Sequence, residues 1–410
     1  MVNSRHKMLY EKLKKNQLII FKNYYFYFFL AQGAYYPLYP IYLSSVAKIS
    51  EGFIGIILSI NPLISIIFQP IWGLINERFQ LDKKLVLLSI TMVNLTTIMI
   101  LLSHQITPLF SFTTIYAFLI LFASIFGIFA CSIGPIQDSI TLQYVNKYGY
   151  KFADVRIWGS IGYAIGAFIA GQLVVLWNYN IVIIMCFIFY GISFFKFLRM
   201  KQVRNNQSLQ IHHQSSFKGL MKNKSFVIFL IFIALSNGVL SAIGNYFFLY
   251  IKENGGGENL VGLATTIIVV IEILFMVVVL KLNNRFSDLT LIITAIILQI
   301  PVLFIFIMSQ NIYILLIVLM LRGASQGLLI PVIVSFISSI LPPKQIALAL
   351  MIYSAFSIGL TGFLTSISGG FIIENYSYRI FFIIILILVI ISILFGLILS
   401  KVKKHVIIKL

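Results

Sequence analysis

The sequence predicts an all-α membrane protein with twelve transmembrane helices, arranged as two six-helix bundles. Of its 410 residues, 60% are hydrophobic and only 10% are charged, and the mean hydropathy is +1.01. A soluble globular domain has far more polar residues, so the composition indicates a chain whose solvent is lipid. Apolar runs of about 20 residues, the length that crosses a bilayer core as helix, recur along nearly the whole chain.

Twelve spans are predicted, and a polar linker divides them. The first half, residues 1–198, contains spans at 23–46, 53–75, 85–103, 110–144, 156–177 and 179–198. The second half, residues 223–410, contains spans at 223–251, 260–282, 288–308, 312–340, 346–372 and 379–400. The stretch 199–222 is rich in Gln, Asn, Ser and His and is the predicted cytoplasmic linker. The run 23–46 is longer than a signal-peptide core and lacks a small-x-small cleavage pattern, so we expect a retained first span.

A short internal repeat supports the division into two similar halves. Ile-Asn-Glu-Arg-Phe at Ile75–Phe79 recurs as Leu-Asn-Asn-Arg-Phe at Leu282–Phe286, six spans later. Parallel repeats of this kind are typical of transporters that rock two bundles around a site at the middle of the membrane.

The basic residues predict the orientation in the membrane. Of the 30 Lys and Arg residues, 26 belong to the termini and the connections on one side, and only Lys48, Lys252 and Arg379 lie on the other. Because the cytoplasmic side collects Lys and Arg, both termini are predicted to be cytoplasmic, in a multi-pass protein of the cell membrane. The net charge of +19 reflects this asymmetry and contact with the lipid bilayer, so we expect no nucleic-acid partner.

Neither a metal site nor an enzyme active site is expected. Cys131 and Cys186 lie far apart in apolar segments, which indicates no disulfide framework and no metal site. The sequence shows no nucleophile–base pair, no metal cluster and no nucleotide-binding loop, so we expect a protein that is not an enzyme and needs no cofactor. We expect it to act as a monomer.

Three charged residues lie well inside predicted spans, away from the span ends: Asp138, Glu272 and Arg322. Such a residue costs several kcal/mol unless it is paired or hydrated, so it usually faces a cavity on a substrate or ion path. Arg156 begins the span after Asp138, and a helical hairpin could bring the two side chains together as a charge pair. Pro135, which frees backbone groups that need a polar surrounding, favours a functional site here. The alternative is a charge pair that only holds two helices together at the cytoplasmic mouth.

Glu272 is the predicted proton carrier. It has no basic residue within one helical turn, and an apolar surrounding favours the neutral acid, which is the form that carries a proton. The alternative is a glutamic acid that only hydrogen-bonds a neighbouring helix. Arg322 is the predicted partner in proton coupling, although its long side chain could instead reach the interface or simply neutralise Glu272 across the bundle.

Small residues at four-residue spacing occupy equivalent spans of the two halves. They are Gly162, Gly166 and Ala170 in span five, and Gly362, Ser366 and Gly370 in span eleven. Such stripes let helices approach closely, and sliding contacts between the halves would be a further use.

Several motifs resemble the major facilitator superfamily. Phe26–Pro40 and Phe68–Gly73 resemble the start of lactose permease and its relatives. Val155–Tyr163, with its Arg-x-Trp-Gly-Ser-Ile-Gly core, resembles the sugar, nucleoside and phenylpropionate proton symporters of that superfamily. The resemblance extends over most of the chain and implies the major facilitator fold.

The resemblance also implies roles for single residues. Asp138 and Arg156 match the acid and the arginine that grip sugar hydroxyls, and a planar arginine suits vicinal hydroxyls. Tyr163 falls where a tryptophan stacks on the sugar ring, and Ser160 replaces a cysteine that lines the same pocket. Glu272 matches a glutamate of related symporters.

The loop after span two resembles the conformational latch of the superfamily. Gly73, Glu77 and Arg78 stand at its signature positions, with glutamate in place of aspartate. In the second half, Arg322 stands near a lysine or histidine of the family, whereas span seven contains no acidic residue where lactose permease carries two.

These residues together predict proton-coupled uptake of a small hydrophilic solute, such as a sugar, an oligosaccharide or a nucleoside, by alternating access. Gln32 and Asn245 are further candidates for the pocket. The alternative is a proton-driven drug or metabolite exporter of the same fold. Against it, Gly159–Gly171 contains no proline, although such exporters carry a Gly-Pro-rich motif in span five.

Overall fold

The computed structural model describes residues 2–79, 81–106, 112–201, 217–282 and 285–407, and every regular element among them is a helix. In the first half these are α1 (Val2–Tyr35), α2 (Tyr39–Ile41), the π-helical turn η1 (Tyr42–Val46), α3 (Glu51–Phe79), α4 (Asp82–Ile106), α5 (Phe112–Tyr148), α6 (Ala153–Trp177) and α7 (Asn180–Arg199).

The second half follows with further helices and two more π-helical turns. They are α8 (Phe217–Met221), α9 (Lys224–Ile233), η3 (Ala234–Gly238), α10 (Val239–Glu253), α11 (Glu258–Leu282), α12 (Asp288–Ile297), α13 (Gln299–Met308), α14 (Ile312–Ile340), α15 (Pro343–Tyr353), η4 (Ser354–Leu360), α16 (Thr361–Asn375) and α17 (Tyr378–Ile407).

Eleven segments of the described chain are long and apolar enough to cross a membrane, and they coincide with the predicted spans from 53–75 to 379–400. The first predicted span, 23–46, is shared between the end of α1, the short α2 and η1. The prediction of an all-helical membrane protein is therefore confirmed, whereas the count of twelve spans stays a prediction. Most of the linker 199–222 lies outside the described residues.

Breaks within three spans have local causes. Pro301 lacks the N–H that would bond to the carbonyl of residue 297, and α12 ends at Ile297. The turns η3 and η4 interrupt two other spans and pack on each other: a Cβ added at Gly238 would lie 2.3 Å from the carbonyl oxygen of Ser357. π-helical turns often occur near functional sites, and η4 packs on α3 of the other half.

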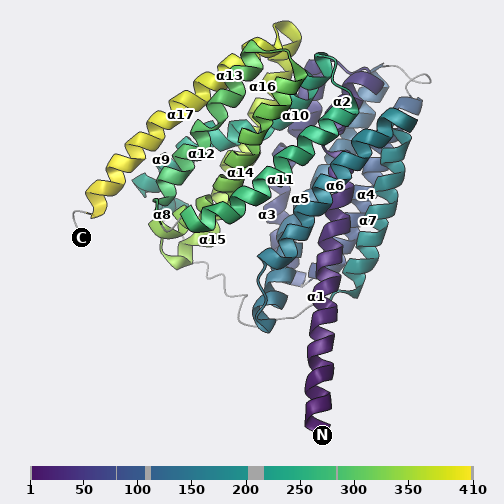
Figure 1. Ribbon diagram of the computed structural model, residues 1–410, viewed down its shortest axis with the longest axis vertical. Helices are drawn as coiled ribbons and strands as arrows, with labels where there is room; N and C mark the ends of the chain where they lie inside the picture. The colour runs from purple at the N-terminus through teal and green to yellow at the C-terminus, as the bar shows by residue number, and fades with distance from the viewer. Residues whose placement is uncertain (1, 80, 107–111, 202–216, 283–284, 408–410) are drawn as a thin grey trace.

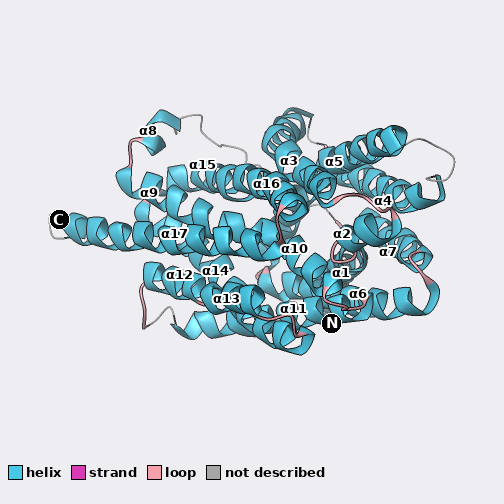
Figure 2. Ribbon diagram, turned by 90° about the horizontal axis from the view of Figure 1, so that it is seen from above, coloured by secondary structure: helices cyan, strands magenta, loops and turns pink. Residues whose placement is uncertain are grey.

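The helices of the two halves form two groups that meet along a central seam. Figure 2 shows α4, α5, α6 and α7 on one side and α9, α12, α14 and α17 on the other. Across the seam, α3 packs against α16 and α6 packs against α11. The start of α1 and the end of α17 lie toward the same end of the molecule (Figure 1), which we call the terminal end, and we call the opposite one the far end.

Paired glycines bring the two halves into backbone contact at the far end. A Cβ added at Gly55 on α3 would lie 2.9 Å from the Cα of Gly370 on α16. A Cβ added at Gly171 on α6 would lie 3.0 Å from the Cα of Gly262 on α11. Only residues without a side chain allow helices this close, so these four glycines close the seam at the far end.

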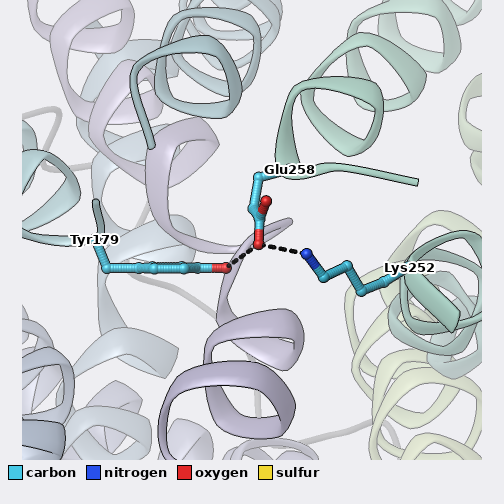
Figure 3. Close-up of polar contacts among 3 residues, drawn as sticks. All are labelled: Tyr179, Lys252 and Glu258. Atoms are coloured by element: carbon cyan, nitrogen blue, oxygen red, sulfur yellow. Dashed lines mark hydrogen bonds and ion pairs between the residues drawn. The ribbon is translucent and has the colours of Figure 1, made fainter. Parts of the chain in front are cut away.

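Polar contacts join the halves at the same end. The hydroxyl of Tyr179, which precedes α7, donates to Glu258 Oε1 at 3.5 Å, and Lys252 Nζ lies 2.8 Å from the same oxygen (Figure 3). On the other side of the seam, the backbone N–H of Gly52 donates to Glu374 Oε2 at 2.7 Å. This N–H belongs to the first turn of α3, where a helix attracts negative charge. The structure is therefore closed at the far end.

The two predicted stripes of small residues allow close approach, but to different partners. In span five, a Cβ at Gly162 would lie 2.2 Å from the carbonyl oxygen of Phe26, and one at Gly166 would lie 2.1 Å from that of Leu30. Span five therefore packs on α1 of its own half. In span eleven, Gly370 contacts Gly55 of the other half, so this stripe, together with Gly171, lies on the seam between the halves.

Candidate functional site

Asp138 is held by α1 rather than by an arginine. The hydroxyl of Tyr25 donates to Asp138 Oδ1 at 2.5 Å, and the neighbouring Tyr24 donates to Gln137 Oε1 at the same distance. Both tyrosines are fully buried, and they fix the two polar side chains of α5 that follow Pro135. The carboxylate therefore has a fixed position before any solute binds.

Arg156 lies near Asp138 but is not paired with it. The two side chains interact electrostatically, yet no ion pair within 4.0 Å joins these two described residues, which corrects the predicted charge pair. The guanidinium instead stacks over the ring of Phe29 on α1, with 4.5 Å between Cζ and the ring centroid. Its Nη1 is buried without a hydrogen-bond partner among the described residues. An unsatisfied buried donor is costly, so this atom is ready for an acceptor on a solute.

Glu272 on α11 lies within electrostatic reach of an arginine from each half. It interacts electrostatically with Arg156 on α6 and with Arg322 on α14. Packing fixes its backbone, because a Cβ at Gly327 on α14 would lie 2.4 Å from the carbonyl oxygen of Glu272. The structure thus brings Asp138, Arg156, Glu272 and Arg322 into one electrostatic chain across the seam, which the sequence alone did not place together.

Arg322 repeats in the second half the arrangement of Arg156 in the first. It is 4% exposed and stacks over the ring of Phe247 on α10, with 4.9 Å between Cζ and the centroid. Its Nη2 donates to the carbonyl oxygen of Leu240 at 3.1 Å, and its Nη1 has no partner among the described residues. Of the alternatives for Arg322, a side chain that reaches the membrane interface is wrong, because the guanidinium is buried against α10.

The other predicted pocket residues follow the seam from Arg156 toward the far end. Ser160 lies one helical turn beyond Arg156 on α6, and Tyr163 lies one turn further. Tyr163 interacts electrostatically with Glu272 and with Tyr36 on α1. Gln32 on α1 is half-buried in the same region, where the adjacent Gly33 packs on the backbone of Tyr163.

A cavity of about 180 Å³ lies between the halves, and Tyr36, which interacts with Tyr163, lines it. We call it the outer chamber. Its polar lining residues are Tyr36, Tyr39, Asn61, Asn245 and Ser366, and Phe126 closes one side. The predicted pocket residue Asn245 therefore lines a cavity, together with Asn61 from the other half, which the sequence analysis did not single out.

The predicted latch is only partly described. A Cβ at Gly73 would meet nothing within 4 Å, Arg78 lies over the ring of Phe79, and the side chain of Glu77 lies outside the described residues. Asn76 donates a hydrogen bond to Asp82 and so joins α3 to α4 across this loop. The latch stays a prediction.

Apart from Gln32, the residues of α1 that support the charges were not predicted from the sequence. Tyr25, Phe29, Gln32 and Tyr36 follow one another at spacings of four, three and four residues, which places them on one face of a helix. This polar and aromatic face could have been found from the helical period of span one. It contacts in turn Asp138, Arg156, the region of Tyr163, and the outer chamber.

The helical fold, with its two groups of helices and its charged residues within the spans, defines a secondary transporter with many membrane spans. The chain belongs to the MFS_1 like family, whose model matches residues 18–384. This confirms the predicted membership of the major facilitator superfamily, and the protein is a transporter and not an enzyme.

Relatives and solved structures agree with this assignment. The chain is 28% identical to an uncharacterized transporter of Bacillus subtilis, YwbF, over 87% of this chain and 86% of that one. It is 25% identical to a maltose permease of Geobacillus stearothermophilus, over 93% and 94%. The crystal structure of the nucleoside transporter NupG is similar with a TM-score of 0.77 and 16% identity, over 95% and 99%. A D-xylose-proton symporter has a TM-score of 0.71 and 12% identity, over 94% and 96%.

Proposed function

We propose that this protein takes up a sugar across the cell membrane together with protons, as a monomer. The observation that carries the proposal is the electrostatic interaction of Glu272 with both Arg156 and Arg322, while Asp138 interacts with the same Arg156. The similarity to maltose, sucrose and lactose permeases supports a sugar over other hydrophilic solutes.

Substrate and proton meet at Arg156. When Glu272 is ionised, its charge attracts the Arg156 guanidinium and competes with the solute for it. When Glu272 is protonated, the guanidinium is free to donate to vicinal hydroxyls, and Asp138 accepts from another hydroxyl. The loaded carrier therefore forms only when both the proton and the sugar are present, which is the requirement for symport.

The conformation shown is one end point of alternating access. With both termini in the cytoplasm, closure at the far end means that the site is shut off from the outside. Opening requires that the glycine contacts between α3 and α16 and between α6 and α11 separate. Rocking of the two halves around Asp138, Arg156 and Glu272 then exposes the site to either side in turn.

The test is uptake of radiolabelled maltose and sucrose by proteoliposomes under an imposed pH gradient, acidic outside. Glu272→Gln keeps the size of the side chain and imitates the protonated acid permanently. We expect accumulation driven by the gradient to fall at least about tenfold, while exchange of internal for external sugar continues. The matched control is Glu253→Gln at the end of α10, which should accumulate sugar like the wild type. Full accumulation by Glu272→Gln would show that the proton role is wrong, and transport outward would favour the exporter.

A further inference from the structure

One face of α1 contacts both a carboxylate of α5 and a guanidinium of α6. The hydroxyl of Tyr25 donates to Asp138 Oδ1 at 2.5 Å and lies 3.2 Å from Thr141 Oγ1. Four residues further along α1, the ring of Phe29 lies under the guanidinium of Arg156, with 4.5 Å between Cζ and the ring centroid. Four residues of helix correspond to a rise of roughly 6 Å. The side chains that hold the two opposite charges are therefore about one helical turn apart.

Packing fixes both of these α1 side chains. Tyr25 is fully buried, and its ring stacks with that of Phe29, with 6.0 Å between centroids, and meets the ring of Phe152 edge to face. A Cβ added at Gly159 on α6 would lie 2.8 Å from Phe29 Cδ2 and 2.9 Å from Arg156 Nη1. Any other residue at this position would push the ring or the guanidinium aside. The contact between α1 and α6 thus determines where the guanidinium lies.

The two charges are held apart against their attraction. Asp138 and Arg156 interact electrostatically, yet no ion pair within 4.0 Å joins these two described residues. Opposite charges attract far more strongly in a protein interior than in water, and a guanidinium that reaches a carboxylate binds it through two parallel hydrogen bonds. Such a pair would occupy the donors and acceptors that a solute needs. In the structure, Arg156 Nη1 instead has no hydrogen-bond partner among the described residues.

We propose that Tyr25 and Phe29 are positioning residues, which hold Asp138 and Arg156 apart so that both charges stay available to the solute. Without them, the carboxylate and the guanidinium join as an ion pair, and a solute has to displace one charge from the other. The inference rests on the proposed function, because it takes the solute to bind at Asp138 and Arg156. These two residues touch the solute, whereas Tyr25 and Phe29 act only through them.

The first experiment measures initial uptake of radiolabelled maltose, sucrose and lactose against concentration in proteoliposomes. Tyr25→Phe removes the hydroxyl and keeps the ring, and Phe29→Leu, the second variant, removes the ring. Each should raise the KM for the sugar that the wild type accumulates at least about tenfold. The maximal rate should stay within about twofold, because saturating solute overcomes an ion pair that only competes with it.

The residues directly before these two on α1 provide matched controls. Tyr24→Phe removes an equally buried hydroxyl, which donates to Gln137 and not to Asp138. Phe28→Leu removes a buried ring that stacks with Tyr24. Both controls should keep the KM of the wild type within about twofold. Equal increases of the KM in Tyr24→Phe and Tyr25→Phe would overturn the inference, because lost packing of α1 would then explain both.

A second experiment detects the ion pair without any transport. Asp138→Asn and Arg156→Gln each remove one charge, and their effects on the midpoint of thermal unfolding in detergent are measured singly and together. With Tyr25 present, the two shifts should add within roughly 1–2 °C. In Tyr25→Phe the shifts should depart from additivity by more than this, because the second change costs little once the first has broken the pair.

Other outcomes contradict the inference in distinguishable ways. Equal departure from additivity with and without the Tyr25 hydroxyl would overturn the separation of the charges. An unchanged KM in both Tyr25→Phe and Phe29→Leu would overturn their role in solute binding and leave sugar uptake intact. Absence of uptake for the whole panel would refute the proposed function, and the unfolding midpoints alone would then decide whether α1 holds the two charges apart.

Discussion

At the scale of single residues, each half of the site presents one arginine over one phenylalanine. Arg156 lies over Phe29 and Arg322 over Phe247, and in both cases the aromatic ring belongs to a helix near the start of its half. A ring face attracts a cation without using its hydrogen-bond donors. The arginine is thereby held in place while Nη1 stays free for a solute or for Glu272.

Arg156→Lys tests this arrangement. Lysine keeps the charge but loses the planar guanidinium, which both stacks on Phe29 and donates to two hydroxyls at once. We expect sugar uptake to lose about 1–3 kcal/mol of binding free energy, which raises the KM roughly 5- to 150-fold. The measurement is initial uptake against sugar concentration in proteoliposomes.

Arg379→Lys is the control for this change. Arg379 is exposed at the start of α17 and does not line the cavity between the halves, so its replacement should leave the KM unchanged. An unchanged KM in Arg156→Lys would mean that Arg156 supports the helices and does not bind the solute, the alternative that the sequence left open.

At the scale of elements, α6 has two faces with different tasks. One face packs on the backbone of α1 through Gly162 and Gly166, within the first half. The other meets α11 of the second half through Gly171. We expect α6 to move with α1 and to separate from α11 when the far end opens. Because Arg156 and Tyr163 belong to α6, this movement would shift them as well.

Gly171→Val should weaken the closed far end. A Cβ at Gly171 would lie 2.6 Å from the carbonyl oxygen of Glu258, so α6 and α11 must separate to accept it. We expect the closed form to lose roughly 1–3 kcal/mol, as for other overpacked contacts. The expected readout is a lower midpoint of thermal unfolding in detergent and slower sugar uptake.

The matched control is Gly191→Val, which makes the same change of helix propensity at a position with open space around it. Its thermal midpoint should stay within a degree or two of the wild type, in line with a surface substitution. Equal effects of the two variants would show that propensity, and not the contact between α6 and α11, determines the result.

At the scale of the whole molecule, the Lys and Arg residues in every second connection between helices predict the orientation in the membrane. Twenty-six of the 30 Lys and Arg residues lie toward the predicted cytoplasmic side, and the glycine-paired far end is nearly free of them. Its one described ion pair, between Lys252 and Glu258, neutralises one of the few cations there. The positive side therefore coincides with the terminal end of the structure.

Fusions to reporter enzymes test this orientation. Alkaline phosphatase, which folds only outside the cytoplasm, should be active when fused after Ser377, between α16 and α17 at the far end. It should be inactive when fused after Lys201, at the start of the linker, or at Lys404. A green fluorescent protein at Lys404 should fluoresce. The opposite pattern would reverse the orientation and make the conformation shown here open to the outside.

How much the sequence alone predicts depends on whether a feature is local or between helices. Residue type and helical period predict the spans, the stripes of small residues, and the charged residues within spans, which are Asp138, Glu272 and Arg322. The pairing of Asp138 with Arg156 was wrong in its detail, because spacing along two helices does not determine which side chain turns toward which. Tyr25 takes the carboxylate and Phe29 takes the guanidinium.

By itself the sequence determined that this chain is a helical membrane transporter of the major facilitator superfamily. Lipid imposes that result, since backbone polar groups in a bilayer must be satisfied within each helix, and apolar runs then reveal the spans. Only the tertiary structure decided that Glu272 lies within electrostatic reach of arginines of both halves, that the far end is closed, and that Asn61 and Asn245 share a chamber. These are contacts across the seam, and they depend on how the two halves are rotated against each other.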